Sequence, residues 1–134
     1  MCCVLGYAGH DLSKEKFTEL LMRTASRGPD DQRVAETEFG LLGFGRLAIM
    51  GLTPEGMQPF LLHGNYLVCN GEIYGFRPVK EALIRKGYAF ASDSDCEILL
   101  PLYEELGTEM FSHLDAEFAL VLYDAARNLS LIHI

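Results

Sequence analysis

The second residue of the chain has the chemistry of a nucleophile that carries its own base. If Met1 is removed, which a small second residue permits, Cys2 becomes N-terminal and its thiol lies beside a free α-amine. An α-amine has an ordinary pKa of roughly 7.7 to 8, so part of it is neutral near pH 7 and could take the thiol proton. A cysteine at this position also occurs without any catalytic role, and Cys2 alone leaves both interpretations open.

An amide side chain and a glycine at the end of an apolar run suit the stabilisation of a negative oxygen. In the segment CNGEIY at 69–74, the Asn70 carboxamide and the Gly71 backbone N–H could both donate to the oxygen of a tetrahedral intermediate. Glycine also lets a substrate approach the backbone closely. The Asn-Gly pair is a strong hairpin signal as well, and the residues by themselves favour that turn.

Three charged residues could recognise the two charged ends of a free amino acid. Arg46 ends an apolar segment and could hold a carboxylate with two parallel hydrogen bonds. Glu72 and Asp95 could accept from an ammonium group. Each of the three, taken alone, is better explained as a surface charge or a helix cap, and Asp95 follows Ser94 at an expected helix start.

Strands and helices must position these residues. Short apolar runs that end in turn or polar residues predict strands at 3–8, 39–47, 66–70 and 118–123. Helical spacing with capping residues predicts helices at about 13–27, 78–86 and 94–106. The third helix opens on a capping box formed by Ser94 and Glu97, and Pro101 predicts a kink in it or a late start. With a loop expected at 51–64, the pattern predicts a layered α+β domain.

Composition excludes several classes of partner. The chain has 134 residues, 49% apolar and 22% charged, which is typical of one globular domain. Its net charge of −8 repels phosphate backbones and anionic lipids, so we expect neither nucleic acid nor membrane as a partner. No apolar run reaches the roughly 18 to 20 residues of a membrane span, and the expected compartment is the cytosol, where the four cysteines remain free thiols.

Five motifs, in their order and spacing, resemble the glutamine-hydrolysing asparagine synthetase family. They are MCCVLGYAG at 1–9, RGPDD at 27–31, GRLAI at 45–49, CNGEIY at 69–74 and SDCEILL at 94–100. More broadly, the chain resembles the class II glutamine amidotransferase domain. Sister families that make glucosamine phosphate or phosphoribosylamine share the nucleophile but typically lack motifs like RGPDD and NGEIY, so the resemblance favours asparagine synthetase.

The resemblance implies a role for each matching position. It makes Cys2 the nucleophile, Asn70 and Gly71 the oxyanion donors, Arg46 the clamp on the α-carboxylate of glutamine, and Glu72 and Asp95 the partners of its α-ammonium group. The segment that contains Leu47, Ile49 and Met50 would offer backbone groups beside the same pocket. The implied reaction is thiolate attack on the side-chain amide, release of ammonia, and hydrolysis of a glutamyl thioester to glutamate.

The resemblance also implies a fold and a larger protein. The implied fold is the four-layer αββα sandwich of N-terminal-nucleophile hydrolases, here expected to be truncated at its C-terminus. Residues 1–134 would form the glutaminase domain, with 129–134 expected to be a non-native tail. Glutaminase chemistry needs no cofactor; ATP and Mg would serve a synthetase domain, absent from this sequence, that amidates aspartate with the ammonia. Oligomeric state, monomer or homodimer, is left open.

Several positions depart from the family pattern, among them Cys3, Gly75, Pro101 and Ala116, and two other functions compete with hydrolysis. Cys3 replaces the usual glycine or serine, and Gly75 replaces the usual asparagine. The first competing function is a non-catalytic module of the same fold that associates with a separate synthetase chain. The second is a zinc site that uses Cys2, Cys3 and either His10 or His63, although adjacent cysteines lack the separation typical of zinc ligands.

Overall fold

Two antiparallel sheets form the centre of the molecule. The computed structural model describes residues 2–133. The first sheet has the order β1-β3-β2 and the second has the order β4-β5-β6-β7. The strands are β1 (Cys3–Ala8), β2 (Asp31–Thr37), β3 (Gly40–Arg46), β4 (Phe60–Leu62), β5 (Asn65–Ile73), β6 (Ala116–Asp124) and β7 (Leu129–His133).

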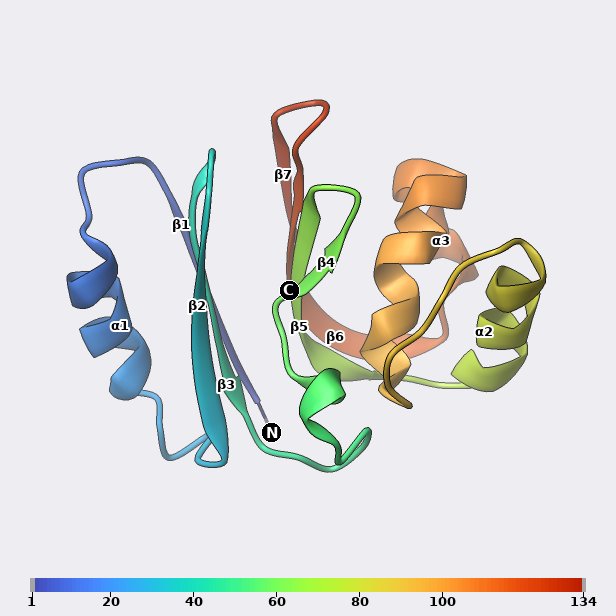
Figure 1. Ribbon diagram of the computed structural model, residues 1–134, viewed down its shortest axis with the longest axis horizontal. Helices are drawn as coiled ribbons and strands as arrows, with labels where there is room; N and C mark the ends of the chain where they lie inside the picture. Colours follow the sequence, from blue (N-terminus) through green and yellow to red (C-terminus); the bar gives the residue numbers. More distant parts are fainter. Residues whose placement is uncertain (1, 134) are drawn as a thin grey trace.

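Helices cover the outer face of each sheet. Helix α1 (Lys14–Met22) lies against the first sheet, whereas α2 (Phe76–Arg85) and α3 (Leu99–Leu106) lie on the opposite side of the molecule against the second sheet (Figure 1). Three 3₁₀ helices complete the described elements: η1 (Pro54–Gly56), η2 (Asp95–Ile98) and η3 (Gly107–His113). The arrangement is therefore an α+β architecture in which sheets lie inside and helices outside.

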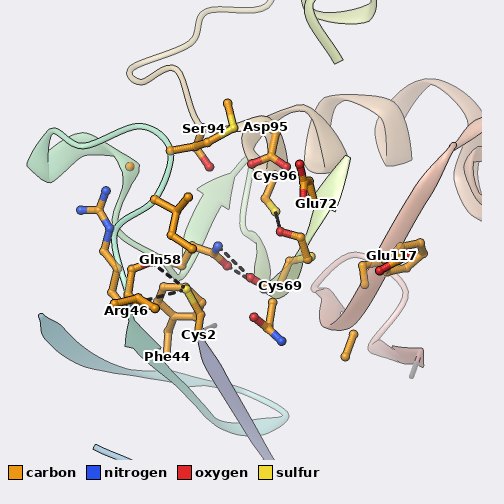
Figure 2. A pocket seen from close by; sticks show the side chains of 18 residues that line it. Cys2, Phe44, Arg46, Gln58, Cys69, Glu72, Ser94, Asp95, Cys96 and Glu117 are labelled. Carbon is orange, nitrogen blue, oxygen red and sulfur yellow. Dashed lines mark hydrogen bonds between the residues drawn. The ribbon is translucent and has the colours of Figure 1, made fainter. Parts of the chain in front are cut away.

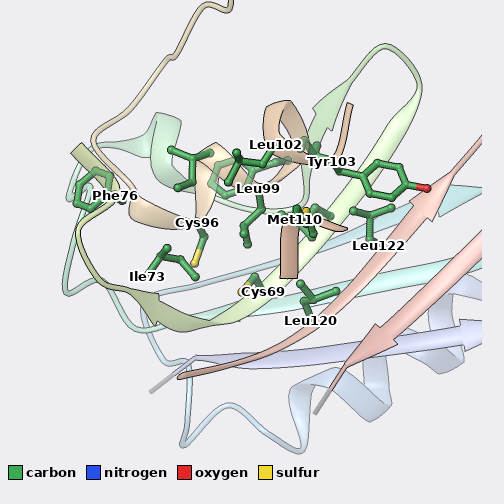
Figure 3. Packing of buried hydrophobic residues seen from close by; sticks show 14 of the residues in the cluster. Cys69, Ile73, Phe76, Cys96, Leu99, Leu102, Tyr103, Met110, Leu120 and Leu122 are labelled. Carbon is green, nitrogen blue, oxygen red and sulfur yellow. The ribbon is translucent and has the colours of Figure 1, made fainter. Parts of the chain in front are cut away.

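The side chains of β5 and β6 alternate between the two faces of their sheet, so the core has two parts. Val68 of β5 and Val121 of β6 face the first sheet, where they pack with Leu42 and Phe44 of β3 in an inter-sheet cluster completed by Met57. The next residues along the same strands face α3, because successive side chains of a strand point to opposite faces. This helix-side cluster is the larger one, and Figure 3 shows its members from both strands meeting α3, η2 and Met110 of η3.

Several predicted elements are confirmed. Strand β1 has the predicted bounds, and α1 begins after Ser13, whose side chain accepts from the Lys16 N–H at 3.2 Å. The late start expected at Pro101 is also confirmed. Helix α3 begins at Leu99, so Pro101 lies in its first turn, where a missing N–H leaves no helical hydrogen bond unmade.

Other predictions are wrong or incomplete. The capping box is wrong: Ser94 makes no side-chain cap bond, and the Glu97 carboxylate instead accepts from the Ala91 and Ser92 N–H groups at 2.7 and 2.9 Å. The region 51–64 is not all loop, since it contains η1 and the short strand β4. Strands β2 and β7 were not predicted, and β5 extends to Ile73, beyond the predicted end at Asn70. Within residues 2–133, no helix combines the length and apolar character that a membrane span needs.

A close glycine contact joins the loop after α1 to β3. A β-carbon at Gly28 would lie 2.2 Å from the Gly45 carbonyl carbon and 2.7 Å from the Arg46 nitrogen. Both neighbours are backbone atoms of a paired strand, so neither can move aside. The glycine therefore allows the loop to lie directly on the end of β3.

We predict that Gly28→Ala lowers the free energy of unfolding by about 1–3 kcal/mol, because the added methyl group overpacks this contact. Urea unfolding followed by circular dichroism measures the change. Gly45→Ala is the matched control: a β-carbon there meets its nearest atom at 3.5 Å, an ordinary contact. Equal destabilisation by the two substitutions would contradict the argument.

Candidate active site

One cavity of about 430 Å³ lies where β1 begins, where β3 ends, and beside the second half of β5. Figure 2 shows side chains from these elements and from η2 around it. All nine site residues predicted from the sequence line this cavity: Cys2, Arg46, Leu47, Ile49, Met50, Asn70, Gly71, Glu72 and Asp95. The structure therefore brings together residues that are up to 93 positions apart in the chain.

The sheet itself positions Cys2. Strand β1 pairs with β3 from Cys3 opposite Gly45, so the preceding residue lies beside the end of β3. The Cys2 thiol donates to the Leu47 carbonyl, and the Leu47 N–H donates to the sulfur, each at 3.4 Å. Cys2 is partly buried and packs against the inter-sheet cluster. These contacts aim the sulfur at the segment that follows β3.

The edge of β5 away from β6 presents backbone groups to the cavity. Strand β4 begins at Phe60, opposite Leu67, and pairs only with residues 65–67 of β5, so it does not reach this part of the strand. At Cys69, the Gln58 side chain accepts from the N–H at 2.6 Å and donates to the carbonyl at 2.9 Å. At Ile73, the Asp95 Oδ2 accepts from the N–H at 2.7 Å.

Gly71 lies midway between these two occupied positions. Alternate residues of a strand direct their N–H groups to the same edge, so the Gly71 N–H points with those of Cys69 and Ile73, away from β6. Gly71 itself leaves no room for a side chain, because a β-carbon there would lie 2.5 Å from that of Phe118 and 2.8 Å from the Glu117 carbonyl oxygen. The expected hairpin turn at Asn-Gly is wrong, since both residues lie within β5 and pair with β6.

The Asn70 side chain lies on the face of β5 that Cys2 occupies. Val68, two residues earlier, belongs to the inter-sheet cluster against which Cys2 packs. Side chains two apart in a strand share a face, so Asn70 is directed between the sheets toward the beginning of β1. The Asn70 carboxamide and the Gly71 N–H, which has no hydrogen-bond partner among residues 2–133, thus line the same cavity as the thiol.

Arg46 forms part of the cavity wall and is buried, with only 7% of its surface exposed. Its Nη1 donates to the Thr53 carbonyl at 3.0 Å, and its Nη2 donates to the Gly51 carbonyl. These bonds hold the loop that carries Ile49 and Met50 along the cavity. A guanidinium has five N–H donors, so further donors remain for a bound anion.

The other charged residues differ in burial. Asp95 is 6% exposed, and Glu72 is exposed. The carboxylates of both residues line the same cavity as Arg46 (Figure 2). The cavity therefore has a cation on one wall and two anions on another, which suits a zwitterion.

Nine residues that line the cavity were not predicted as site residues, and four of them carry polar or thiol side chains that matter here: Gln58, Cys69, Cys96 and Glu117. Gln58, Cys69 and Cys96 are buried, and Glu117 comes from β6. Hydrogen bonding to the Cys69 side chain, followed by burial, raises the pKa of Cys96 well above its ordinary value, so Cys96 stays a neutral thiol. Cys69 and Cys96 lie within the CNGEIY and SDCEILL motifs but were assigned no role, and Gln58 and Glu117 lie outside the five motifs.

Asp30 is a further residue that sequence reasoning assigned no role. Its Oδ2 accepts from the Ala48 N–H at 2.7 Å, and its own N–H donates to the Arg46 carbonyl at 2.9 Å. Together with the Gly28 contact, these bonds fasten the RGPDD motif to the segment at 47–50. The motif therefore supports the cavity wall from outside.

Two of the departures from the family pattern fit the local structure. Gly75 precedes α2 with φ of 63°, a left-handed conformation that glycine and asparagine adopt most readily. Cys3 pairs opposite Gly45, which has no side chain to compete with the thiol. Among residues 2–133 there is no group of three or more His, Cys, Asp and Glu side chains that could hold a metal ion.

Comparison with known proteins shows which domain family and which curated proteins the chain is similar to. The glutamine amidotransferase domain family matches residues 1–133. A probable glutamine-hydrolysing asparagine synthetase of Acanthamoeba polyphaga mimivirus is 41% identical over 91% of this chain and 23% of that protein. Asparagine synthetase B of Escherichia coli, also glutamine-hydrolysing, is 34% identical over 89% of the chain and 22% of that protein. Amidase chry2 of Gibberella zeae is 40% identical over 84% and 17%.

These matches establish the family of the domain. The chain spans about a fifth of the length of the curated relatives, between 17% and 23% for the three described. The match to the domain family, by contrast, covers all but the last residue of the chain. The chain belongs to the glutamine amidotransferase domain family.

Proposed function

We propose that this chain hydrolyses glutamine to glutamate and ammonia, with Cys2 as the nucleophile after removal of Met1. Met1 itself lies outside the described residues. The observation that carries the proposal is the common cavity. It combines a thiol, a carboxamide, the vacant N–H of Gly71, and charges of both signs. Its volume of about 430 Å³ is ample for one free amino acid.

The first half of the reaction forms a thioester. The α-amine of Cys2 takes the thiol proton, and the sulfur attacks the carbon of the glutamine side-chain amide. The amide oxygen gains negative charge, which the Asn70 carboxamide and the Gly71 N–H stabilise. The ammonium form of the α-amine returns its proton to the amide nitrogen, the C–N bond breaks, and ammonia leaves.

The second half regenerates the thiol. A water molecule gives a proton to the α-amine and attacks the thioester carbon, through a second tetrahedral intermediate held by the same two donors. The C–S bond breaks, the sulfur recovers the proton, and glutamate is released. No redox step or cofactor is required.

Charges on the cavity wall orient glutamine for this attack. Arg46 takes the α-carboxylate with the donors that the loop carbonyls leave unused. Asp95 and Glu72 accept from the α-ammonium group, and the backbone at Leu47, Ile49 and Met50 lies beside the substrate. Fixing both charged ends leaves the side-chain amide to extend toward Cys2.

The wider proposal concerns fold and biological role. We infer that the layers belong to the four-layer αββα sandwich of the N-terminal-nucleophile hydrolases, with residues 1–134 as its glutaminase domain. The ammonia would amidate aspartate in a synthetase domain that uses ATP and Mg; in support, the two relatives described above are named as glutamine-hydrolysing asparagine synthetases. The four free thiols suit the reducing conditions of the cytosol.

We predict that Cys2→Ala abolishes ammonia release from glutamine, because the substitution removes the attacking atom. A coupled glutamate dehydrogenase assay measures the ammonia. Mass spectrometry of the wild-type protein should show Cys2 as the first residue and a glutamyl adduct on it. Cys3→Ala is the control and should keep its activity. Wild-type protein that binds glutamine but releases no ammonia would instead favour the non-catalytic module.

We predict that Arg46→Lys raises KM for glutamine at least about tenfold, with a much smaller change in kcat. A lysine ammonium cannot form two parallel hydrogen bonds to a carboxylate as a guanidinium does. Steady-state kinetics separates the two constants. Arg33→Lys makes the same exchange on the exposed strand β2, where Arg33 contacts only Asp31 among the ion pairs of residues 2–133. An unchanged KM for Arg46→Lys would remove Arg46 from the substrate site.

A further inference from the structure

We propose that Gln58 is a positioning residue for the oxyanion site, a role that rests on the proposed glutaminase reaction. Its side-chain amide makes the two hydrogen bonds to β5 that the backbone of a neighbouring strand would otherwise make. In that place it fixes the stretch of backbone from which both oxyanion donors project.

The pairing register supports this inference. Strand β4 pairs with β5 so that Phe60 lies opposite Leu67 and Leu62 lies opposite Asn65. Continuing the same antiparallel register places position 58 opposite Cys69. Gln58 does occupy that place, but its side chain makes the bonds that a strand residue would make, one to the Cys69 N–H and one to the Cys69 carbonyl.

The course of the chain explains why a side chain is used. Strand β4 begins only at Phe60, and residue 58 lies in the segment that leads from η1 to β4, so its backbone does not continue the ladder. A primary amide has the same donor and acceptor as a peptide group, so it can complete the ladder where the main chain cannot. Gln58 is only 4% exposed, and its two bonds satisfy backbone groups of Cys69, which is 1% exposed.

The consequence for the site follows from the order of residues along β5. Cys69 immediately precedes Asn70 and Gly71. Strand β6 holds one edge of this segment, while on the other edge Gln58 holds position 69 and Asp95 holds position 73. Gly71 lies between these two fixed points, so its N–H is held in place while remaining available. Without Gln58, one of the two supports is lost.

A comparison of acyl transfer with simple alkylation tests the proposal in the full-length protein. Gln58→Leu should lower kcat for glutamine about 10- to 100-fold, with KM changed less than threefold, because misplaced donors weaken transition-state binding. Iodoacetamide alkylates a thiol by direct displacement and forms no oxyanion. The rate at which it labels the Cys2 peptide, followed by mass spectrometry, should therefore stay within twofold of wild type.

Three further variants make the result decisive. Asn70→Ala removes an oxyanion donor directly and should show the same pattern of reduced kcat and normal alkylation. Tyr103→Phe removes another buried hydrogen bond, 2.8 Å from the Tyr103 hydroxyl to Asp124, far from the cavity, and should keep wild-type kcat despite its loss of stability. Gln58→Glu keeps the acceptor for the Cys69 N–H and regains a donor when protonated, so its kcat relative to wild type should rise as pH falls.

The outcomes separate the two proposals. If the wild-type protein does not hydrolyse glutamine, the proposed function fails. If it does, wild-type kcat in Gln58→Leu overturns the positioning role, and so does an equal loss of kcat in Tyr103→Phe. Slow alkylation of Cys2 in Gln58→Leu would show general damage to the site and would also overturn it. Should Gln58→Leu fail to fold, the pH dependence of Gln58→Glu decides, and a constant ratio to wild type counts against the proposal.

Discussion

The unequal lengths of two neighbouring strands create the conditions for this site. Strand β4 has three residues and β5 has nine, so most of one edge of β5 has no partner strand. Unpaired backbone donors normally make an edge a liability. Here side chains satisfy the donors of Cys69 and Ile73, and the cavity receives the donor between them. The remaining features of the site are arranged around this stretch of backbone.

The first sheet supplies the opposing half of the cavity. Strand β3 ends in Arg46, and the chain then passes Cys2 and turns along the pocket. The loop after α1 holds that turn from behind, through glycine packing at Gly28 and the carboxylate of Asp30. Cys2 and Arg46 thus come from the first sheet, Asn70, Gly71 and Glu72 come from the second, and Asp95 comes from η2. Packing in the inter-sheet cluster sets the distance between the two sheets.

Sequence reasoning succeeded where a local pattern carries the information. The apolar run of β1, the cap at Ser13 and the proline in the first turn of α3 were readable from a few residues each. Strand β2 was missed because its sequence, DQRVAET, is largely polar on an edge strand, and β4 because three residues show no periodicity. The site residues were grouped by family resemblance, since nothing in their spacing predicts a shared cavity.

The contribution of Gln58 shows the limit of such reasoning most clearly. A side chain that makes hydrogen bonds in place of a backbone group has no sequence signature before the register of the two strands is known.

The pairing of β1 with β3 fixes where the Cys2 thiol lies. Chain ends are usually free to move, but here the ladder begins one residue after the thiol. Inserting a single amino acid between positions 2 and 3 would carry the sulfur about 3.3 Å along the strand and turn it to the other face of the sheet. The position and facing of the thiol are therefore set by the number of residues that separate it from the first pair of the ladder.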